Sequence, residues 1–247
     1  MAVPKSFIAL SMHKAGSTIA NRILGDIAQV RGYELDLVAN KAWNSSMTAE
    51  EYFISYQPEM KTEGYYYGMV RGAFARKLPV IGSLRAIVQV RDPRDCITSA
   101  YFSFGESHRL PDDDEKRAAF LERREKINSV DIDSFAAPRA RPYRQRMDVL
   151  AQIIDAHDDV LVLKYEEMVL DTEAWLGRIS EFLGQPVTDA LRARLGEKLD
   201  FSVDGEDTSR HKRQVLPGDH RRKLSPETIA AMNADLKDML VRFDYAV

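Results

Sequence analysis

The stretch that most constrains the fold is FIALSMHKAGSTIANRIL, residues 7–24. Its first four residues are apolar and predict a short buried strand. A glycine-containing turn follows, and apolar residues then recur at helical spacing from Thr18 to Val30. Because a strand, a glycine turn and a helix direct backbone N–H groups and a helix dipole at a phosphate, the stretch predicts an anion-binding loop. Lys14 adds a cation to this loop, and Ser17 and Thr18 add hydroxyl groups.

A second informative stretch is AIVQVRDPRDCITSAYFSFG, residues 86–105. It predicts a buried strand over 86–90 and a helix from Pro93 to about Phe104, capped by Asp92 and ended near Gly105. Arg91 follows the strand at its carboxyl end, where open α/β sheets bind ligands. Ser99 lies two turns into the helix, and an Arg with a hydroxyl suits a terminal phosphate. The alternative is that Arg91 pairs with Asp92 or Asp95.

The two stretches resemble the nucleotide-binding motifs of a known family. A Walker A loop reads G-x-x-x-x-G-K-[ST], but here the lysine precedes the glycine. Lys-Ala-Gly-Ser-Thr directly after a strand instead resembles the 5′-phosphosulfate loop of sulfotransferases, which use 3′-phosphoadenosine 5′-phosphosulfate (PAPS). The resemblance implies that the loop binds PAPS and that Arg91 and Ser99 bind its 3′-phosphate. The loop residues concerned are Lys14, Ala15, Gly16, Ser17 and Thr18.

Two later segments extend the resemblance. Residues 160–165 predict a buried strand that continues into Glu166-Glu167-Met168, and this segment is similar to the one whose tyrosine approaches the adenine ring; Tyr165 is that residue here. The basic run 210–221 is similar to the late loop that closes over the 3′-phosphate. Aligning on Gly218-Asp219 gives Arg213 the role of the phosphate-binding arginine, although His220 replaces the tryptophan of the family.

The resemblance implies a fold and a reaction. We expect an α/β, three-layer, P-loop-like fold, in which a central, mostly parallel sheet is flanked by helices, and a single domain over residues 1–247. The reaction implied is transfer of a sulfuryl group from PAPS to a hydroxyl or amine of a small-molecule, carbohydrate or lipid acceptor, with 3′-phosphoadenosine 5′-phosphate (PAP) as product. Lys14 would stabilise the leaving phosphate. We expect no metal ion.

The general base is the least defined part of this prediction. Cytosolic members of the family carry a histidine about two dozen residues before the 3′-phosphate arginine, but the matching stretch here, residues 68–71, has none. Three candidates remain open: His13 beside the loop lysine, Glu63 before the third predicted strand, and His108 after the helix that carries Ser99.

Composition excludes several other classes of protein. The net charge of −3 gives no case for binding nucleic acid or an anionic membrane. No apolar run approaches the ~20 residues of a membrane span. The single cysteine, Cys96, rules out an internal disulfide, and we expect it to be buried in a cytoplasmic protein. The oligomeric state is not predicted.

Two alternative functions stay open. The first is a P-loop small-molecule kinase, which would turn over ATP with Mg²⁺. The second is a catalytically silent nucleotide-binding protein, for which the missing family histidine is the argument. The segments 39–72 and 105–142 are expected to form the acceptor pocket, and 105–142 could act as a lid.

Overall fold

The computed structural model describes residues 3–107, 110, 113–201 and 215–247, and these fall into two compact units. The first unit comprises residues up to Val90 together with 146–200, and the second comprises 91–145 with the chain after 200. The chain returns from the second unit to the first within helix α7 (Ala140–Asp155).

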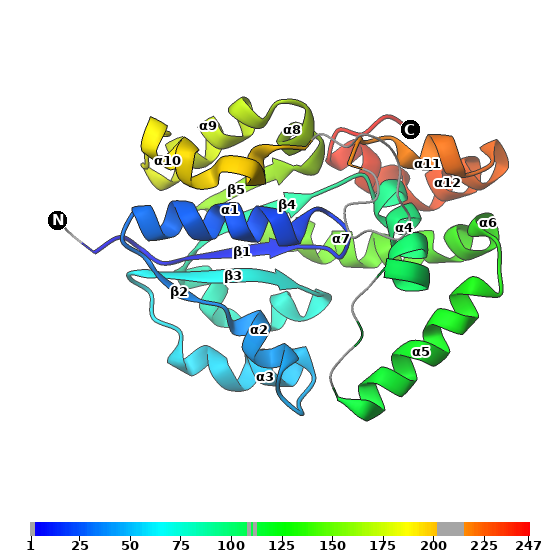
Figure 1. Ribbon diagram of the computed structural model, residues 1–247, viewed down its shortest axis with the longest axis horizontal. Coiled ribbons are helices and arrows are strands. Elements are labelled where there is room, and N and C mark those ends of the chain that lie inside the picture. The colour runs from blue at the N-terminus through cyan, green and yellow to red at the C-terminus, as the bar shows by residue number, and fades with distance from the viewer. Residues whose placement is uncertain (1–2, 108–109, 111–112, 202–214) are drawn as a thin grey trace. The chain divides into compact units, whose positions relative to one another are not determined.

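The first unit is built on one parallel sheet, shown in Figure 1. Its strand order is β2-β3-β1-β4-β5, and all pairings between these strands are parallel. The sheet is therefore entirely parallel, where the sequence predicted a mostly parallel one. The five strands are β1 (Phe7–Ser11), β2 (Glu34–Asp36), β3 (Tyr65–Arg71), β4 (Arg85–Val90) and β5 (Val160–Lys164).

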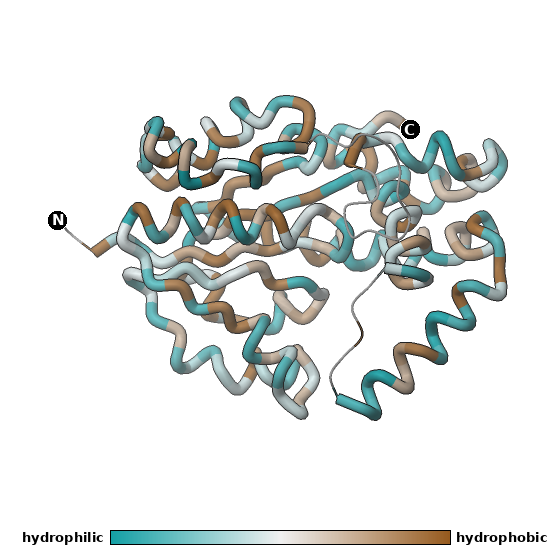
Figure 2. Tube along the Cα trace, viewed as in Figure 1, coloured by the Kyte–Doolittle hydropathy of each residue, from teal (hydrophilic) through white to brown (hydrophobic). Residues whose placement is uncertain are grey.

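Helices flank this sheet, as expected. α1 (Ser17–Val30) lies against β2 and β3, and its hydrophobic residues recur along the helix in Figure 2. Asn21 fixes α1 to β3, because its Oδ1 accepts from the Tyr66 hydroxyl at 2.6 Å and the Met69 N–H at 2.9 Å. The remaining α-helices of the unit are α2 (Val38–Trp43), α3 (Ala49–Tyr56), α8 (Tyr165–Leu170), α9 (Thr172–Leu183) and α10 (Asp189–Leu195).

The central strand β1 is buried along its whole length, between β3 and β4. The chain runs from β1 to β2 and β3 on one side and only then to β4 on the other. The carboxyl ends of β1 and β4 thus flank the point where the strand order reverses, which is where open α/β sheets bind ligands.

In the part that the structure describes, the second unit contains helices and no strand. Besides the start of α7, its α-helices are α4 (Pro93–Phe102), α5 (Asp114–Asn128), α6 (Ile132–Ala136), α11 (Asp219–Lys223) and α12 (Pro226–Arg242). Asp92 caps α4 by accepting from the Arg94 N–H at 2.9 Å, and Ser225 caps α12, as their sequences predict. α5 is hydrophilic along much of its length (Figure 2).

Three local predictions are wrong. Of β5, which the sequence predicted as a buried strand, only Leu163 is buried and the other residues are half-buried. Residues 165–170 form helix α8 rather than a continued strand, so the strand ends at Lys164 and Tyr165 begins the helix. Gly105 does not end the helix after Pro93, because a π-helical turn over Ser103–Ser107 continues it. Cys96 is fully buried, as predicted. Among the residues that the structure describes, no helix combines the length and apolar character needed to cross a bilayer.

Candidate active site

The loop between β1 and α1 has the backbone geometry of an anion site. Lys14 and Gly16 both adopt left-handed conformations, with φ of 70° and 69°. Such a conformation costs a non-glycine residue of order 1–3 kcal/mol, and residues that bear this cost cluster at functional sites. Gly16 directly precedes α1 and has no side chain to cap it, and the first turn of α1 contains no acidic residue. No acidic side chain of this first turn therefore competes with an anion for the first N–H groups of α1.

Gly16 is also needed because an aromatic ring lies against it. A Cβ atom at this position would come within 2.8 Å of Tyr165 Cε2 and 3.0 Å of Met168 Cε. Both contacts come from α8, and Tyr165 itself is buried. The structure therefore brings the predicted adenine-contacting tyrosine to the predicted phosphosulfate loop.

Arg71 joins the same loop from β3, and sequence reasoning gave it no role. It is the last residue of β3 and is paired in register with Ser11, the last residue of β1. Its Nε donates to the Ser17 hydroxyl at 2.6 Å. Burial lowers the pKa of the guanidinium, and no described carboxylate forms an ion pair with it. A half-buried cation with no acidic partner beside a phosphate-type loop is suited to an anionic ligand.

The other loop residues lie as a contiguous turn. Ala15 and Ser17 are buried, whereas Thr18 and His13 are exposed. The donor set of this turn is a lysine, an arginine, a serine hydroxyl and helix N–H groups. This set suits a sulfate or phosphate group.

Glu63 is not brought to this loop. It precedes β3 and pairs with Lys5, which precedes β1, so it lies at the amino edge of the parallel sheet. The seven residues of β3 separate the two edges by about 20 Å at ~3.3 Å per residue. A carboxylate at that distance cannot take a proton from an acceptor held at the loop, so the structure does not support Glu63 as the base.

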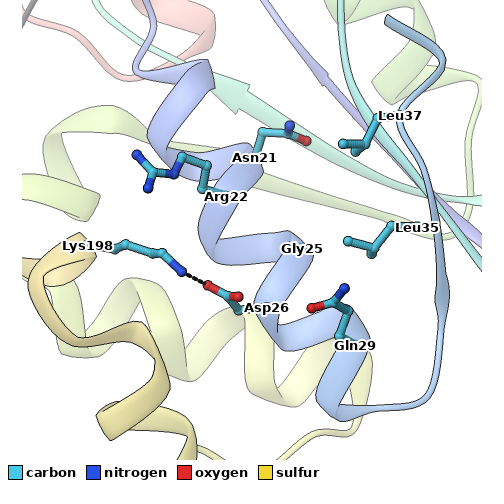
Figure 3. A pocket seen from close by; sticks show the side chains of 8 residues that line it. All are labelled: Asn21, Arg22, Gly25, Asp26, Gln29, Leu35, Leu37 and Lys198. Atoms are coloured by element: carbon cyan, nitrogen blue, oxygen red, sulfur yellow. Dashed lines mark hydrogen bonds and ion pairs between the residues drawn. The ribbon is translucent and has the colours of Figure 1, made fainter. Parts of the chain in front are cut away.

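A cavity of about 260 Å³ lies beside α1, beyond the loop (Figure 3). Its carboxylate, Asp26, is already paired with Lys198 and Arg194. It includes neither Lys14 nor Arg71, so it is separate from the loop site. Its lining residues are Asn21, Arg22, Gly25, Asp26, Gln29, Leu35, Leu37 and Lys198.

In the second unit, Arg91 lies just before α4 and contacts Asp95, and Ser99 lies within α4. Arg91 directly precedes Asp92, the N-cap of α4, and its Nη2 lies 3.4 Å from Asp95 Oδ2. Ser99 is four residues after Asp95 and therefore lies one turn farther along the same face. The pairing with Asp95 that the sequence left open is thus present. It involves one nitrogen of Arg91, whereas a guanidinium carries N–H donors on all three nitrogens, so the pairing is compatible with a phosphate ligand.

Asp95 also binds the chain that begins at Val215. Its Oδ2 accepts from the Gly218 N–H at 2.7 Å, and its Oδ1 accepts from the His220 N–H at 3.0 Å. His220 Nδ1 lies 2.6 Å from the same Oδ1. Burial by itself raises the pKa of Asp95, but the bonds from His220 and the charge of Arg91 outweigh it, so this pKa lies well below the usual range.

Two predicted residues, His108 and Arg213, lie outside the described residues. The residues that the structure does describe contain no cluster of three or more histidine, cysteine or acidic side chains able to hold a metal ion.

Comparison with known proteins agrees with this geometry. A profile of the sulfotransferase domain family matches residues 4–240. Mouse sulfotransferase SULT7A1 complexed with PAP is 18% identical, with a TM-score of 0.64 over 97% of this chain and 86% of that one. A retinol dehydratase in a complex with retinol and PAP is 16% identical, with a TM-score of 0.55 over 97% of this chain and 82% of that one. Sulfotransferase STF9 from Mycobacterium avium is 12% identical, with a TM-score of 0.54 over 100% of this chain and 79% of that one. No curated protein sequence matches the chain.

Proposed function

The chain belongs to the sulfotransferase domain family, and from this premise we propose that it transfers a sulfuryl group from PAPS to a hydroxyl or amine of a small-molecule, carbohydrate or lipid acceptor. The observation that carries the proposal is the loop at the end of β1, where left-handed Lys14 and Gly16 lead into the start of α1 and Arg71 is bonded to Ser17. The family match spans both compact units, which supports treating residues 1–247 as one functional domain.

Lys14 and the N–H groups of Gly16 to Thr18 act on the charge that grows on the leaving phosphate. PAPS, when bound, supplies the sulfuryl group on its 5′-phosphate. The loop donors are fixed by the backbone before the reaction, so they need little reorganisation in the transition state. The enzyme then works mainly by positioning and charge stabilisation, as in phosphoryl transfer.

Arg71 adds a second cation at the same loop. Its Nε is held by Ser17, so its orientation is set while the two terminal nitrogens keep their four N–H donors. We assign these donors to the non-bridging oxygens of the transferred sulfuryl group. An arginine keeps its charge at any working pH, so Arg71 serves as an electrostatic group and not as the base.

Arg91 and Ser99 would bind the 3′-phosphate, and Tyr165 the adenine end of the donor. The contact of Arg91 with Asp95, one turn before Ser99 on α4, supports the first assignment. The packing of Tyr165 on Gly16 supports a place near the nucleotide loop for the second. Arg213, outside the described residues, remains a proposed third ligand of the 3′-phosphate.

His13 is the base candidate that the described structure leaves beside the loop. It is exposed and directly precedes Lys14. If His13 is the base, His13→Ala should lower turnover by about 10²–10⁴-fold and remove the acidic limb of the pH–rate profile. Glu63→Gln serves as the control and should retain both. Normal turnover in both variants would move the assignment to His108 or to the acceptor itself.

The function is tested by incubating the protein with [³⁵S]PAPS and a panel of alcohols, amines and glycans. Transfer of label supports the proposal, and we expect it to persist in EDTA, since the proposed mechanism needs no metal. Turnover of ATP with Mg²⁺ and no transfer from PAPS would identify a kinase instead. Tight PAP binding with no turnover over the whole panel would identify a silent nucleotide-binding protein. A cytoplasmic location stays part of the proposal because the single cysteine suits a reducing compartment.

A further inference from the structure

The carboxylate of Asp95 lies at the centre of a buried polar cluster in the second unit. Arg91, Asp95 and His220 are 4%, 0% and 2% exposed. Asp95 receives backbone bonds from Gly218 and His220 and a side-chain bond from His220, and it faces Arg91. The partners belong to segments more than 120 residues apart, because Gly218 and Asp95 are separated by 123 positions.

Burying the Asp95 carboxylate costs free energy unless its oxygens accept hydrogen bonds. A buried carboxylate without partners is strongly destabilised, whereas a fully bonded one holds its neighbours in a single arrangement. Both oxygens of Asp95 accept hydrogen bonds, so its position is fixed from two sides. Arg91 has a long side chain with many rotamers, and Asp95 is the fixed charge against which it rests.

We propose that Asp95 is a positioning residue that orients Arg91 for the 3′-phosphate, and that Gly218 and His220 hold Asp95 in place. The inference rests on the proposed donor site, since it gives Arg91 the role stated above. An Arg91 oriented in advance binds a phosphate without first losing its side-chain freedom, and this raises affinity. The effect is confined to the 3′-phosphate, because Arg91 is assigned to that group alone.

The experiment compares the affinities of PAP and AMP, which differ only in the 3′-phosphate, by calorimetry. In the wild type, PAP should bind about a hundredfold more tightly than AMP, as two charge-assisted bonds imply. Asp95→Asn should reduce this preference at least about tenfold while AMP affinity changes less than about threefold. Asp133→Asn is the matched control. Asp133 also joins two distant segments, by accepting from the N–H and hydroxyl of Ser225 at 2.9 and 3.1 Å, and it is not part of the Asp95 cluster.

Two substitutions at His220 keep the test decisive if Asp95→Asn does not fold. His220→Phe fills the same space but removes the Nδ1 bond, so it should lower the PAP preference. His220→Asn places an amide N–H near the Nδ1 position and should restore most of it. An unchanged PAP preference in folded Asp95→Asn or His220→Phe would overturn the positioning role. Equal affinity of the wild type for PAP and AMP would instead overturn the donor site on which the proposal rests.

Discussion

Two arginines lie beside the proposed donor sites: half-buried Arg71 contacts the loop after β1, and buried Arg91 directly precedes the N-cap of α4, but their surroundings differ. At the loop, Arg71 is fixed by the neutral hydroxyl of Ser17 and forms no ion pair with a described residue. At α4, Arg91 rests against Asp95, which is itself bonded to Gly218 and His220. The first cation lacks a counter-charge among the described residues, and the second has one.

This difference predicts which property of the protein a substitution at each arginine changes. A cation without a counter-charge destabilises the empty protein but acts at full strength on an anion. A cation in a bonded cluster is stable in the empty protein, and its carboxylate partner offsets part of its charge. Substitutions at the loop should therefore change turnover, whereas substitutions at α4 should change stability and nucleotide affinity.

The largest effect is expected from Lys14→Ala. Removal of one preorganised charge-stabilising group typically lowers turnover by about 10²–10³-fold. Because the charge that Lys14 is proposed to stabilise is complete on the 5′-phosphate of PAP, the affinity for PAP should fall as well, whereas the affinity for PAPS, whose 5′-phosphate still carries the sulfuryl group, should fall less. Single-turnover kinetics and PAP calorimetry separate the two quantities. A variant with only a raised KM for PAPS would make Lys14 a simple binding residue.

Asp95→Asn should lower the free energy of unfolding by about 3 kcal/mol at neutral pH, since it removes the buried carboxylate that faces Arg91 and accepts from Gly218 and His220. Because the pKa of Asp95 is lowered in the folded protein, its contribution is complete above the unfolded value of about 3.9 and is lost as the pH falls below it. Urea unfolding should thus show that the difference in free energy of unfolding between wild type and variant becomes smaller below about pH 4. Glu122→Gln, in an exposed pair with Lys126, is the control and should show no difference from wild type. A difference in free energy of unfolding that does not change with pH would contradict stabilisation by the ionised Asp95 carboxylate.

Arg71→Gln should lower turnover by about 10–100-fold, since one charged donor pair is worth roughly 1.5–3 kcal/mol. The free energy of unfolding should stay the same or rise, because the variant removes a buried charge that has no described counter-charge. Arg71→Lys should recover little, since a single ammonium cannot contact both Ser17 and an anion. Arg76→Gln is the control, because Arg76 is exposed and lies in the short helical turn that follows β3. A large loss of stability in Arg71→Gln would show that the side chain has a structural role.

The smallest effect should separate backbone strain from crowding at the loop. Gly16 and Gly32 both have positive φ, but only Gly16 faces a ring; at Gly32, nothing lies within 4 Å of the position that a Cβ atom would take. Gly32→Ala should therefore lower the free energy of unfolding by only about 1 kcal/mol, because alanine disfavours the positive φ at this position. Gly16→Ala should cost about 1–2 kcal/mol more and weaken PAP binding by moving the Tyr165 ring. Equal losses in thermal unfolding would show that the ring moves aside freely.

Local sequence signals predicted most of the fold. The apolar runs of β1 and β4 mark buried strands, and Asp92-Pro93 and Ser225-Pro226 mark helix starts. Thr48 and Glu51, three residues apart, form a capping box at the start of α3. These features depend on residues close together in the chain, so sequence reasoning reaches them.

The site was predicted less completely because much of it depends on distant pairings. Arg71 reaches Ser17 only because β3 lies beside β1, and Asp95 meets His220 across 125 positions. No pattern of neighbouring residues in the sequence indicates either pairing. Glu63 is different, since a residue that precedes a strand of a parallel sheet must lie at the edge opposite the carboxyl ends of the strands. That signal was in the sequence and excludes Glu63 from the loop.

The burial of Cys96 gives the second unit a built-in reporter. Its thiol is the only one in the chain and lies fully buried next to Asp95 in the first turn of α4. A thiol reagent can reach it only when this turn opens, so the labelling rate measures the free energy of local opening. A nucleotide held by Arg91 should slow that rate in proportion to its occupancy. The chain therefore carries its own probe of ligand binding, with no introduced label or acceptor substrate.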